Sequence, residues 1–337
     1  MIEGEDSAFV SFDEGDVCDF APPRTGTEQA LTSSISFITP SYRGDFSRST
    51  LLFESMDKHA RSYERHYVIV HDEDYALFAP YHRGRREILP ASRFLPDWLH
   101  QMPAFIRWRG RRYMWSLKAL PVFGWHTQQL VKIAAAATLP ETRFCLVDSD
   151  NAFFRPFDVA RLASDPTIPL YVEPKSVVDE KERHTQWVKV AHRVLGLAPP
   201  GFPADDYIGQ IIVWDKATVQ AMIRRIESAT GQGWAQALCR AHSFSEYMIY
   251  GSFVMNDAEQ KARHVVTSQS FCQAHWDLSN PDRKMVLGMM RQSLPHQVAL
   301  CVQSFNATPL DTMRAAIADF AAEAGGGVEA MTGTHPA

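Results

Sequence analysis

Cysteine is scarce in this sequence, as are long apolar runs and any large excess of one charge. The 337 residues include five cysteines, which are scattered and show no Cys-x-x-Cys spacing, so neither a zinc cluster nor a disulfide framework is predicted. No run approaches 18 apolar residues and no basic and apolar leader is present, so we expect neither a transmembrane helix nor a signal peptide. The net charge of -5 argues against a protein whose surface binds nucleic acid globally. A cytoplasmic protein is the simplest expectation, with peripheral association at the inner membrane face left open.

What is present is the composition of an ordinary globular enzyme with a sizeable core. Hydrophobic residues make up 45% of the chain and charged residues 22%. Residues 1–34 carry eight acidic side chains and one basic one, and this balance predicts a disordered leader. We expect a single large domain over residues 35–322 and a flexible tail over residues 323–337.

Apolar β-type runs alternate with segments of helical spacing along most of this domain. This order is typical of an α/β, Rossmann-type fold, in which a mixed and mainly parallel sheet is flanked by helices. Strands are predicted at residues 35–42, 67–70, 85–89, 143–147, 169–173, 207–214, 264–270 and 298–303. Helices are predicted at residues 47–60, 125–139, 185–195, 216–229, 234–239, 245–254 and 311–323.

Two aspartates follow the buried strand predicted near Phe144, in the segment RFCLVDSDNAFF that begins at Arg143. Because alternate residues of an extended chain point the same way, Asp148 and Asp150 are expected to direct their carboxylates at one hard cation, Mn²⁺ or Mg²⁺. Adjacent carboxylates are hard to bury together unless a cation neutralises them. A polar turn that merely ends the strand is the alternative.

The elements around these aspartates resemble the core of GT-A glycosyltransferases, notably the glycogenin-like group. A helix that bears Lys132 precedes the strand, and aromatic residues and Arg155-Pro156-Phe157 follow the Asp-Ser-Asp motif. The resemblance implies that Asp148 and Asp150 bind the metal and that Lys132 approaches the diphosphate of the donor. A lysine suits this role as a point charge on phosphate. An exposed helix lysine would give the same pattern.

The resemblance continues more weakly downstream. The segment 207–214 contains Gly209 and resembles the glycine-containing strand of the family, although Ile208 stands where the family usually has asparagine. Glu246 resembles an acidic residue that begins a helix and faces the reacting sugar in the family, which implies a catalytic role, with Asp206 as the second choice. Capping of the helix is the alternative role for Glu246 and the serine before it.

By position, the resemblance also implies which residues bind the donor and complete the metal site. The implied donor-binding residues are Thr39, Pro40, Tyr42, Asp72, Lys132, Ser149 and Gly209. His275 has a chain position compatible with a metal-ligating histidine, but the family's usual His-x-x-Gly-x-x-Lys-Pro-Trp segment is absent. A structural role for His275 is the alternative.

The resemblance covers residues 35–305 in element order, and the chain as a whole resembles an uncharacterised set of bacterial proteins assigned to the GT-A superfamily. It implies a nucleotide-binding half at residues 35–157 and an acceptor half at residues 158–322. The expected activity is metal-dependent transfer of a sugar from a nucleotide diphosphate donor, with UDP-sugar the first choice. The acceptor is the hydroxyl of a glycan, a lipid-linked molecule or a small molecule. The glycogenin-like arrangement hints at a retaining outcome.

Two other functions are compatible with an Asp-x-Asp strand end. A magnesium phosphatase of the haloacid-dehalogenase kind also has this motif, but its nucleophile normally lies on the first strand of the core domain, and here about three strands precede Asp148. An inactive nucleotide-sugar-binding protein is the second alternative. A further basic segment holds Arg107, Arg109, Arg111 and Arg112 around Trp108. It suits a phosphate or sugar group, and a solvated charge run explains it as well.

Overall fold

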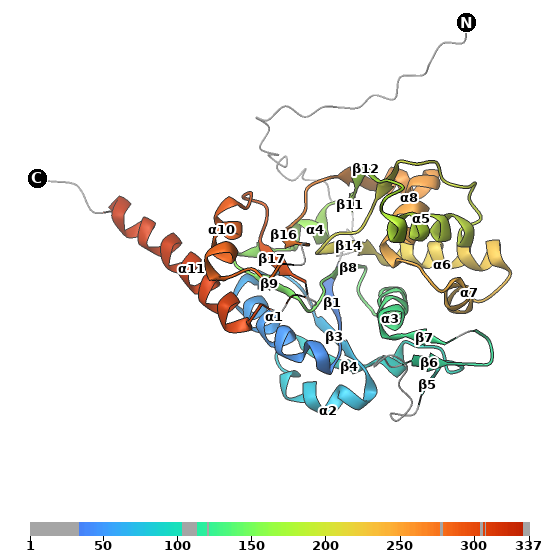
Figure 1. Cartoon of the computed structure of the whole chain (residues 1–337), viewed down its shortest axis with the longest axis horizontal. Coiled ribbons are helices and arrows are strands. Elements are labelled where there is room, and N and C mark those ends of the chain that lie inside the picture. The colour runs from blue at the N-terminus through green and yellow to red at the C-terminus, as the bar shows by residue number, and fades with distance from the viewer. Residues whose placement is uncertain are drawn as a thin grey trace, which may run out of the picture. The chain divides into compact units, whose positions relative to one another are not determined.

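A five-stranded sheet in the order β14, β8, β1, β3, β4 organises the chain (Figure 1). The computed structural model describes residues 34–102, 113–119, 121–276, 279–303, 306 and 308–332. The arginine cluster at 107–112, the leader up to residue 33 and the last five residues lie outside this part of the chain. The described residues from Ser34 onwards belong to one compact unit.

Four strands of this sheet are parallel and the fifth is antiparallel. The strands β1 (Ile35–Ser41), β3 (His66–Val70), β4 (Arg86–Pro90) and β8 (Arg143–Leu146) run in the same direction. The edge strand β14 (Ile212–Asp215) runs against β8, with Ile212 opposite Leu146. The predicted α/β class, with a mixed and mainly parallel sheet in one domain, is therefore confirmed.

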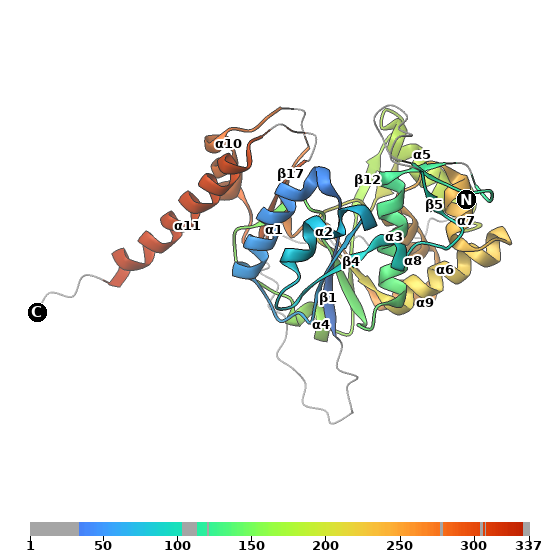
Figure 2. The same ribbon diagram turned by 90° about the horizontal axis from the view of Figure 1, so that it is seen from below.

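Helices cover both faces of the sheet, and the alternation of side chains along the strands explains how. In β1, Ile38 packs in the core that includes α3 (Gly124–Thr138), whereas its neighbour Phe37 packs in the core that includes α1 (Phe46–His59). All seven residues of β1 are buried. A strand covered on both faces needs such a continuous apolar run. Figures 1 and 2 show α1 and α3 on opposite sides of β1.

The remaining elements extend the fold around this centre. The other helices are α2 (Tyr75–Phe78), α4 (Ala160–Ser164), α5 (Glu182–Val194), α6 (Lys216–Thr230), α7 (Trp234–Ala241), α8 (Glu246–Asn256), α9 (Ala258–Arg263), α10 (Arg283–Gln292) and α11 (Leu310–Thr332). Short 3-10 turns cover Arg43–Asp45, Asp72–Asp74, Ala79–Tyr81 and Ala91–Arg93. Within the part of the chain that the structure describes, no helix is both long and apolar enough to span a membrane.

Smaller sheets complete the described strands. One joins β16 (Cys272–His275), β17 (Ala299–Val302) and β9 (Asn151–Phe153), and another joins β5 (His100–Gln101), β6 (Tyr113–Trp115) and β7 (Val122–Phe123). Three pairs are formed by β10 (Phe157–Asp158) with β2 (Ala60–Arg61), β11 (Ile168–Tyr171) with β15 (His264–Thr267), and β12 (Glu173–Val177) with β13 (Ala204–Asp206).

The strand predicted over residues 207–214 is shorter than expected. The observed strand β14 begins only at Ile212, because Ile211 has a φ of 60° and cannot continue an extended chain. A β-branched residue in this left-handed region is strained, so the surrounding contacts must hold it there. Residues 207–211 consequently form an irregular segment at the end of the strand. The strand β16 and the helices α9 and α10 were not predicted from the sequence.

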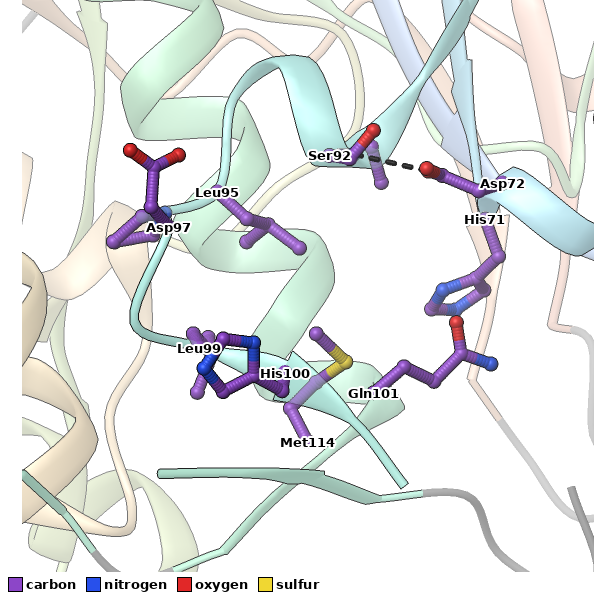
Figure 3. Close-up of a pocket in the computed structure, with 11 residues that line it drawn as sticks. His71, Asp72, Ser92, Leu95, Asp97, Leu99, His100, Gln101 and Met114 are labelled. Carbon is purple, nitrogen blue, oxygen red and sulfur yellow. Dashed lines mark hydrogen bonds between the residues drawn. The ribbon is translucent and has the colours of Figure 1, made fainter. Parts of the chain in front are cut away.

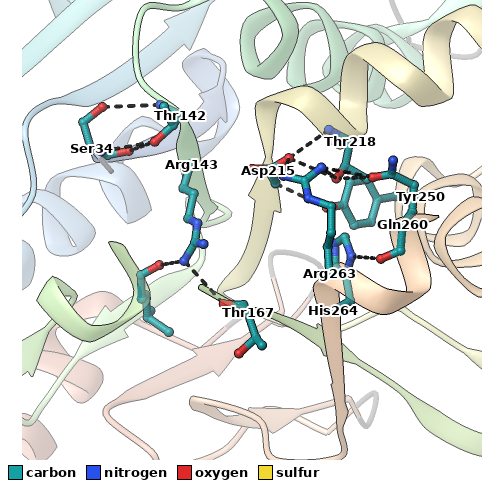
Figure 4. A network of polar contacts seen from close by, with 11 residues as sticks. Ser34, Thr142, Arg143, Thr167, Asp215, Thr218, Tyr250, Gln260, Arg263 and His264 are labelled. Carbon is teal, nitrogen blue, oxygen red and sulfur yellow. Dashed lines mark hydrogen bonds and ion pairs between the residues drawn. The ribbon is translucent and has the colours of Figure 1, made fainter. Parts of the chain in front are cut away.

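A buried polar network anchors β14 to the helices behind it (Figure 4). Asp215, the last residue of the strand, accepts hydrogen bonds from the backbone N–H of Thr218 at 2.9 Å and from Arg263 at 3.0 Å. The Tyr250 hydroxyl accepts the backbone N–H of Asp215 at 3.2 Å and contacts Nε2 of His264 at 2.9 Å. Asp215 pairs in register with the first residue of β8. The network therefore fixes the edge of the sheet opposite to the end of β8 where the two aspartates lie.

Candidate functional site

The two aspartates of the motif lie in a turn directly after β8. Asn151 donates both its backbone N–H, at 3.2 Å, and its side-chain Nδ2, at 3.0 Å, to the backbone carbonyl of Asp148. The chain is therefore not extended through Asp148 and Asp150, and the alternation on which the sequence argument relied does not apply. Asp148 lines a large cavity, whereas Asp150 lies beside Asp45 and Cys301.

A buried lysine sits at the centre of the site. The Nζ of Lys132 is 2.7 Å from Oδ1 of Asp148, 3.0 Å from Oε1 of Glu246 and 3.0 Å from the Tyr247 hydroxyl. Burial alone would lower the pKa of Lys132, but the charges of Asp148 and Glu246 outweigh it and raise this pKa well above its usual value. Lys132 is therefore a fixed positive charge. The structure thus brings together three of the predicted site residues, Lys132, Asp148 and Glu246. Lys132 is buried and is not an exposed helix lysine.

Two helices hold this group in place. Lys132 projects from α3, and Glu246 is the first residue of α8, whose N-cap Ser245 accepts the backbone N–H of Met248 at 3.5 Å. One turn before Lys132, Gln129 accepts the backbone N–H of Glu246 at 3.1 Å through its Oε1. Burial raises the pKa of Glu246, and the neighbouring Lys132 partly opposes this effect. Glu246 therefore contacts Lys132 in the candidate site and is also the first residue of α8.

Asp150 lies where negative charge is crowded. Burial, followed by the charges of Asp148 and Asp45, raises the pKa of Asp150 to about 7. Burial also raises the pKa of Asp45, whose Oδ2 is 3.4 Å from Oγ of Ser149. Asp45 follows β1 and was not recognised from the sequence. The sequence feature that could have indicated it is an acidic residue in the loop after the first strand. This loop lies near the end of β8, because β1 and β8 are parallel neighbours in the sheet.

The side chains present fit a hard divalent cation in chemistry but not as a complete site of their own. Carboxylate oxygens are the ligands that Mg²⁺ and Mn²⁺ prefer, and crowded, partly buried carboxylates are what such a cation neutralises. Among the described residues, however, no group of three or more His, Cys, Asp and Glu side chains is arranged to hold a metal ion. A cation here would need ligand atoms from a substrate, as is usual for Mg²⁺ bound with nucleotide phosphates.

His275 does not join the aspartates. It is buried in β16, and its Nε2 is 3.1 Å from both the backbone carbonyl and the hydroxyl of Ser279. Ser279 therefore engages Nε2 of His275, as expected for a structural role. Among the described residues, His275 forms no metal-binding group with the two aspartates.

The residues expected to bind the nucleotide are divided between the core and the sheet edge. Thr39 is buried within β1 and its hydroxyl is 2.9 Å from Nε2 of His66, and Pro40 is buried beside it. Tyr42, directly after β1, is 40% exposed. Asp72 follows β3 and accepts the backbone N–H of Ser92 at 3.0 Å. Tyr42 and Asp72 are therefore available at the sheet edge, whereas Thr39 and Pro40 are packed inside the strand.

Asp72 lines a cavity of about 280 Å³ beside the carboxyl ends of β3 and β4 (Figure 3). Its walls include His71, His100 and Gln101, with Leu95, Leu99 and Met114 as apolar lining. Polar groups at the rim of an apolar hollow are typical of small-ligand sites.

A larger cavity, of about 900 Å³, opens in front of Asp148, Lys132 and Glu246. Because β14 runs antiparallel to β8, the segment before β14 meets the aspartate turn, and Asn151 donates to Oε1 of Gln210 at 2.8 Å. Gly209 lines the cavity, and a Cβ there would lie 3.0 Å from the Tyr171 ring. Ser149, in contrast, is buried and faces Asp45.

Aromatic and basic side chains of α3 and α5 form one wall of this cavity. The rings of Trp125 and Trp187 stack with centroids 5.2 Å apart. The guanidinium of Arg183 lies 5.7 Å from the Trp187 ring centroid, and Lys181 lines the cavity next to it. Flat aromatic faces beside cations suit a sugar that carries an anionic group.

Asp206 lies in the wall of this cavity, and its side chain contacts a histidine. It is 2% exposed, its Oδ2 is 2.6 Å from Nδ1 of His184, and its Oδ1 accepts the backbone N–H of Ile208 at 2.9 Å. His184 lines the cavity from α5. His184 was not recognised from the sequence, because its partner Asp206 lies in a different element, β13.

Comparison with known proteins places the chain in a family. No curated protein matches the sequence. The model of a family of unknown function, DUF6492, matches residues 32–325, which include all the site residues described above. The match covers most of the chain, and the protein therefore belongs to the DUF6492 family.

Proposed function

We propose that this protein is a metal-dependent glycosyltransferase that moves a sugar from a nucleotide diphosphate donor to an acceptor hydroxyl. The observation that carries the proposal is the buried Lys132, whose ammonium joins Asp148 and Glu246 at the end of β8 and faces the 900 Å³ cavity. A fixed cation at this edge of an α/β sheet is where a diphosphate would be neutralised.

The two cavities support a donor that extends along the sheet edge. The smaller one, next to Asp72, has a volume of about 280 Å³ and suits a nucleoside base. The larger one, in front of Lys132, has room for a sugar and part of an acceptor. Tyr42 follows β1, which lies between β3 and β8 in the sheet, so it is placed to contact the nucleoside. UDP is the first choice because the resemblance to glycogenin-like enzymes favours it.

Asp148 and Asp150 would hold the cation, with Asp45 adding negative charge nearby. When bound, Mn²⁺ or Mg²⁺ would neutralise charge on the diphosphate leaving group. Lys132 supplies a second positive charge there, which should stabilise the leaving group more as the glycosidic bond breaks. Glu246 holds Lys132 in position through its Oε1. Gly209 allows the backbone to pack closely against Tyr171 at the cavity wall, because a Cβ at this position would crowd the Tyr171 ring.

The test is a thermal-shift panel of UDP, GDP and their sugars, each with and without Mn²⁺, on the wild type, on Asp148→Asn and on Asp311→Asn. Asp311 is a suitable control because it lies on α11 with a 99% exposed side chain. At a ligand concentration of about 100 Kd we expect stabilisation by about 2.7 kcal/mol, or roughly 5 °C in Tm, in the wild type and the control.

In Asp148→Asn the metal-dependent shift should be lost. Nucleotide binding without turnover in any acceptor mixture would favour the inactive-binding alternative. Magnesium-dependent phosphatase turnover without any nucleotide response would contradict the transferase and favour the phosphatase.

A further inference from the structure

We infer that His184 is the group that takes the proton from the acceptor hydroxyl, and that Asp206 positions its imidazole. This inference rests on the glycosyl transfer proposed above and adds a catalytic residue to it. Its starting point is a pair of side chains that line the same cavity as Lys132, in which Nδ1 of His184 and Oδ2 of Asp206 are 2.6 Å apart.

The hydrogen bonds around Asp206 determine which nitrogen of His184 is available. Both carboxylate oxygens of Asp206 are engaged, one by the backbone N–H of Ile208 and the other by His184. An ionised Asp206 accepts the Nδ1 proton, which places the lone pair of the neutral imidazole on Nε2. Since the side chain of His184 is 30% exposed and Nδ1 is turned to Asp206, Nε2 is the nitrogen open to the cavity.

The other acids of the cavity are less suited to accept this proton. The Oε1 of Glu246 and the Oδ1 of Asp148 are both bound to the ammonium of Lys132. Asp206 is buried, and both of its carboxylate oxygens are already engaged, by His184 and by the backbone N–H of Ile208. Glu173 lines the cavity as an exposed carboxylate on β12, so it is the competitor that the experiment must separate from His184.

The size of the cavity fits a proton acceptor on this wall. A volume of about 900 Å³ corresponds to a sphere about 12 Å across, which leaves room for one sugar ring and an acceptor hydroxyl in the cavity that Lys132 and His184 both line. The imidazole also packs against Trp187, with ring centroids 4.9 Å apart. The same aromatic wall that would contact an acceptor sugar therefore carries the base.

The step balances without a further reactant. The acceptor O–H gives its proton to Nε2 of His184, and the oxygen forms the new bond to the anomeric carbon. The bond from that carbon to the diphosphate oxygen breaks, and its electron pair leaves with the diphosphate, beside Lys132. The imidazolium that forms is stabilised by Asp206 and returns its proton to solvent.

Several charged side chains line the cavity together with His184. They are Asp206 of β13, Glu173 of β12, and Lys181 and Arg183 at the start of α5. Glu173 pairs in register with Asp206. General-base catalysis by an imidazole makes the rate fall as the pH decreases.

The experiment measures UDP release from UDP-glucose, UDP-galactose and UDP-N-acetylglucosamine with Mn²⁺ and alkyl glycosides as acceptors, over a range of pH. The variants are His184→Gln, Asp206→Asn, Glu173→Gln and the control His192→Gln. His192 lies on the same helix, but its Nδ1 contacts the backbone carbonyl of Ala198 at 2.6 Å. We expect His184→Gln to lower kcat by about 10²- to 10⁴-fold with unchanged UDP affinity and to remove the acidic limb of the profile.

Asp206→Asn should also lower kcat and change the profile, because an amide no longer enforces the Nδ1–H tautomer. His192→Gln should behave as the wild type. Equal activity and an unchanged profile in His184→Gln overturn the inference while leaving the transferase intact. Loss of the acidic limb in Glu173→Gln alone overturns it in favour of Glu173. A wild type that neither binds UDP nor turns over any donor overturns the proposed function and this inference with it.

Discussion

Replacing Lys132 with methionine should cost this protein stability as well as turnover. The substitution keeps the length of the aliphatic chain but removes the ammonium that contacts Asp148, Glu246 and Tyr247. Glu246 is 3% exposed and would keep a buried carboxyl without its partner. Removing one member of a buried ion pair costs about 3–5 kcal/mol, a large part of the roughly 5–15 kcal/mol that stabilises a typical domain.

The pH dependence of this loss follows from Glu246. Burial already raises the pKa of Glu246 in the folded protein, and loss of Lys132 raises it further. In the unfolded chain a glutamate ionises near pH 4.3, so the folded variant binds more protons than the unfolded one above this pH. The stability lost in Lys132→Met should therefore grow as the pH rises from about 4.5, by up to about 1.4 kcal/mol per unit, and shrink as the pH falls.

The assay is urea unfolding followed by tryptophan fluorescence at pH 4.5, 6 and 7.5 for Lys132→Met, Glu246→Gln and the double variant. Lys261→Met serves as a control, since Lys261 lies on α9 and is exposed. The double variant should recover at least about 1 kcal/mol relative to the sum of the single losses. A loss below about 1 kcal/mol in Lys132→Met, or a loss independent of pH, would refute the view that Lys132 neutralises a buried carboxylate.

Two further predictions concern other buried positions. Burial, with the positive charges of His242 and Arg183, lowers the pKa of His126 to about 4. The stability that comes from keeping His126 neutral is fully present above pH 6.5 and is lost as the pH falls towards 4. The free energy of unfolding, measured with urea, should therefore fall between pH 7 and pH 4.5 by up to about 3 kcal/mol less in His126→Phe than in the wild type. An equal fall in the two proteins would contradict this. In Gly251→Ala the new Cβ would lie 2.1 Å from the Tyr207 ring. The expected loss is about 1–3 kcal/mol in unfolding free energy, and a variant as stable as the wild type would show that the ring moves aside freely.

The strands and helices that pack the core could be predicted because their sequence patterns match their surroundings. The run before Asp148 is apolar since β8 is covered on both faces, and the alanine-rich segment before it forms α3 as expected. The resemblance of the helix, the strand and the acidic loop to a known fold assigned Lys132 and Asp148 to one site, although their direct ion pair was not predicted. These features depend on local pattern and on the usual path of an α/β chain.

Features that depend on tertiary contacts could not be predicted in the same way. Hydrophobicity favoured a strand through Ile211, but its positive φ ends the strand and is imposed by its surroundings. His184 meets Asp206 only because β13 pairs with β12 just before α5. Asp45 meets the aspartate turn across the sheet edge, and Ser279 engages Nε2 of His275. None of these pairings has a signature in the residues themselves.

The helix α3 has a consequence for how such a site can change during evolution. Trp125 and Lys132 both line the larger cavity from this one helix, seven residues apart, which is about 10 Å along the axis. Insertions in the loops around the cavity can reshape its mouth without altering this spacing. The mouth of the cavity can therefore change while the distance between the aromatic residue and the ammonium stays the same.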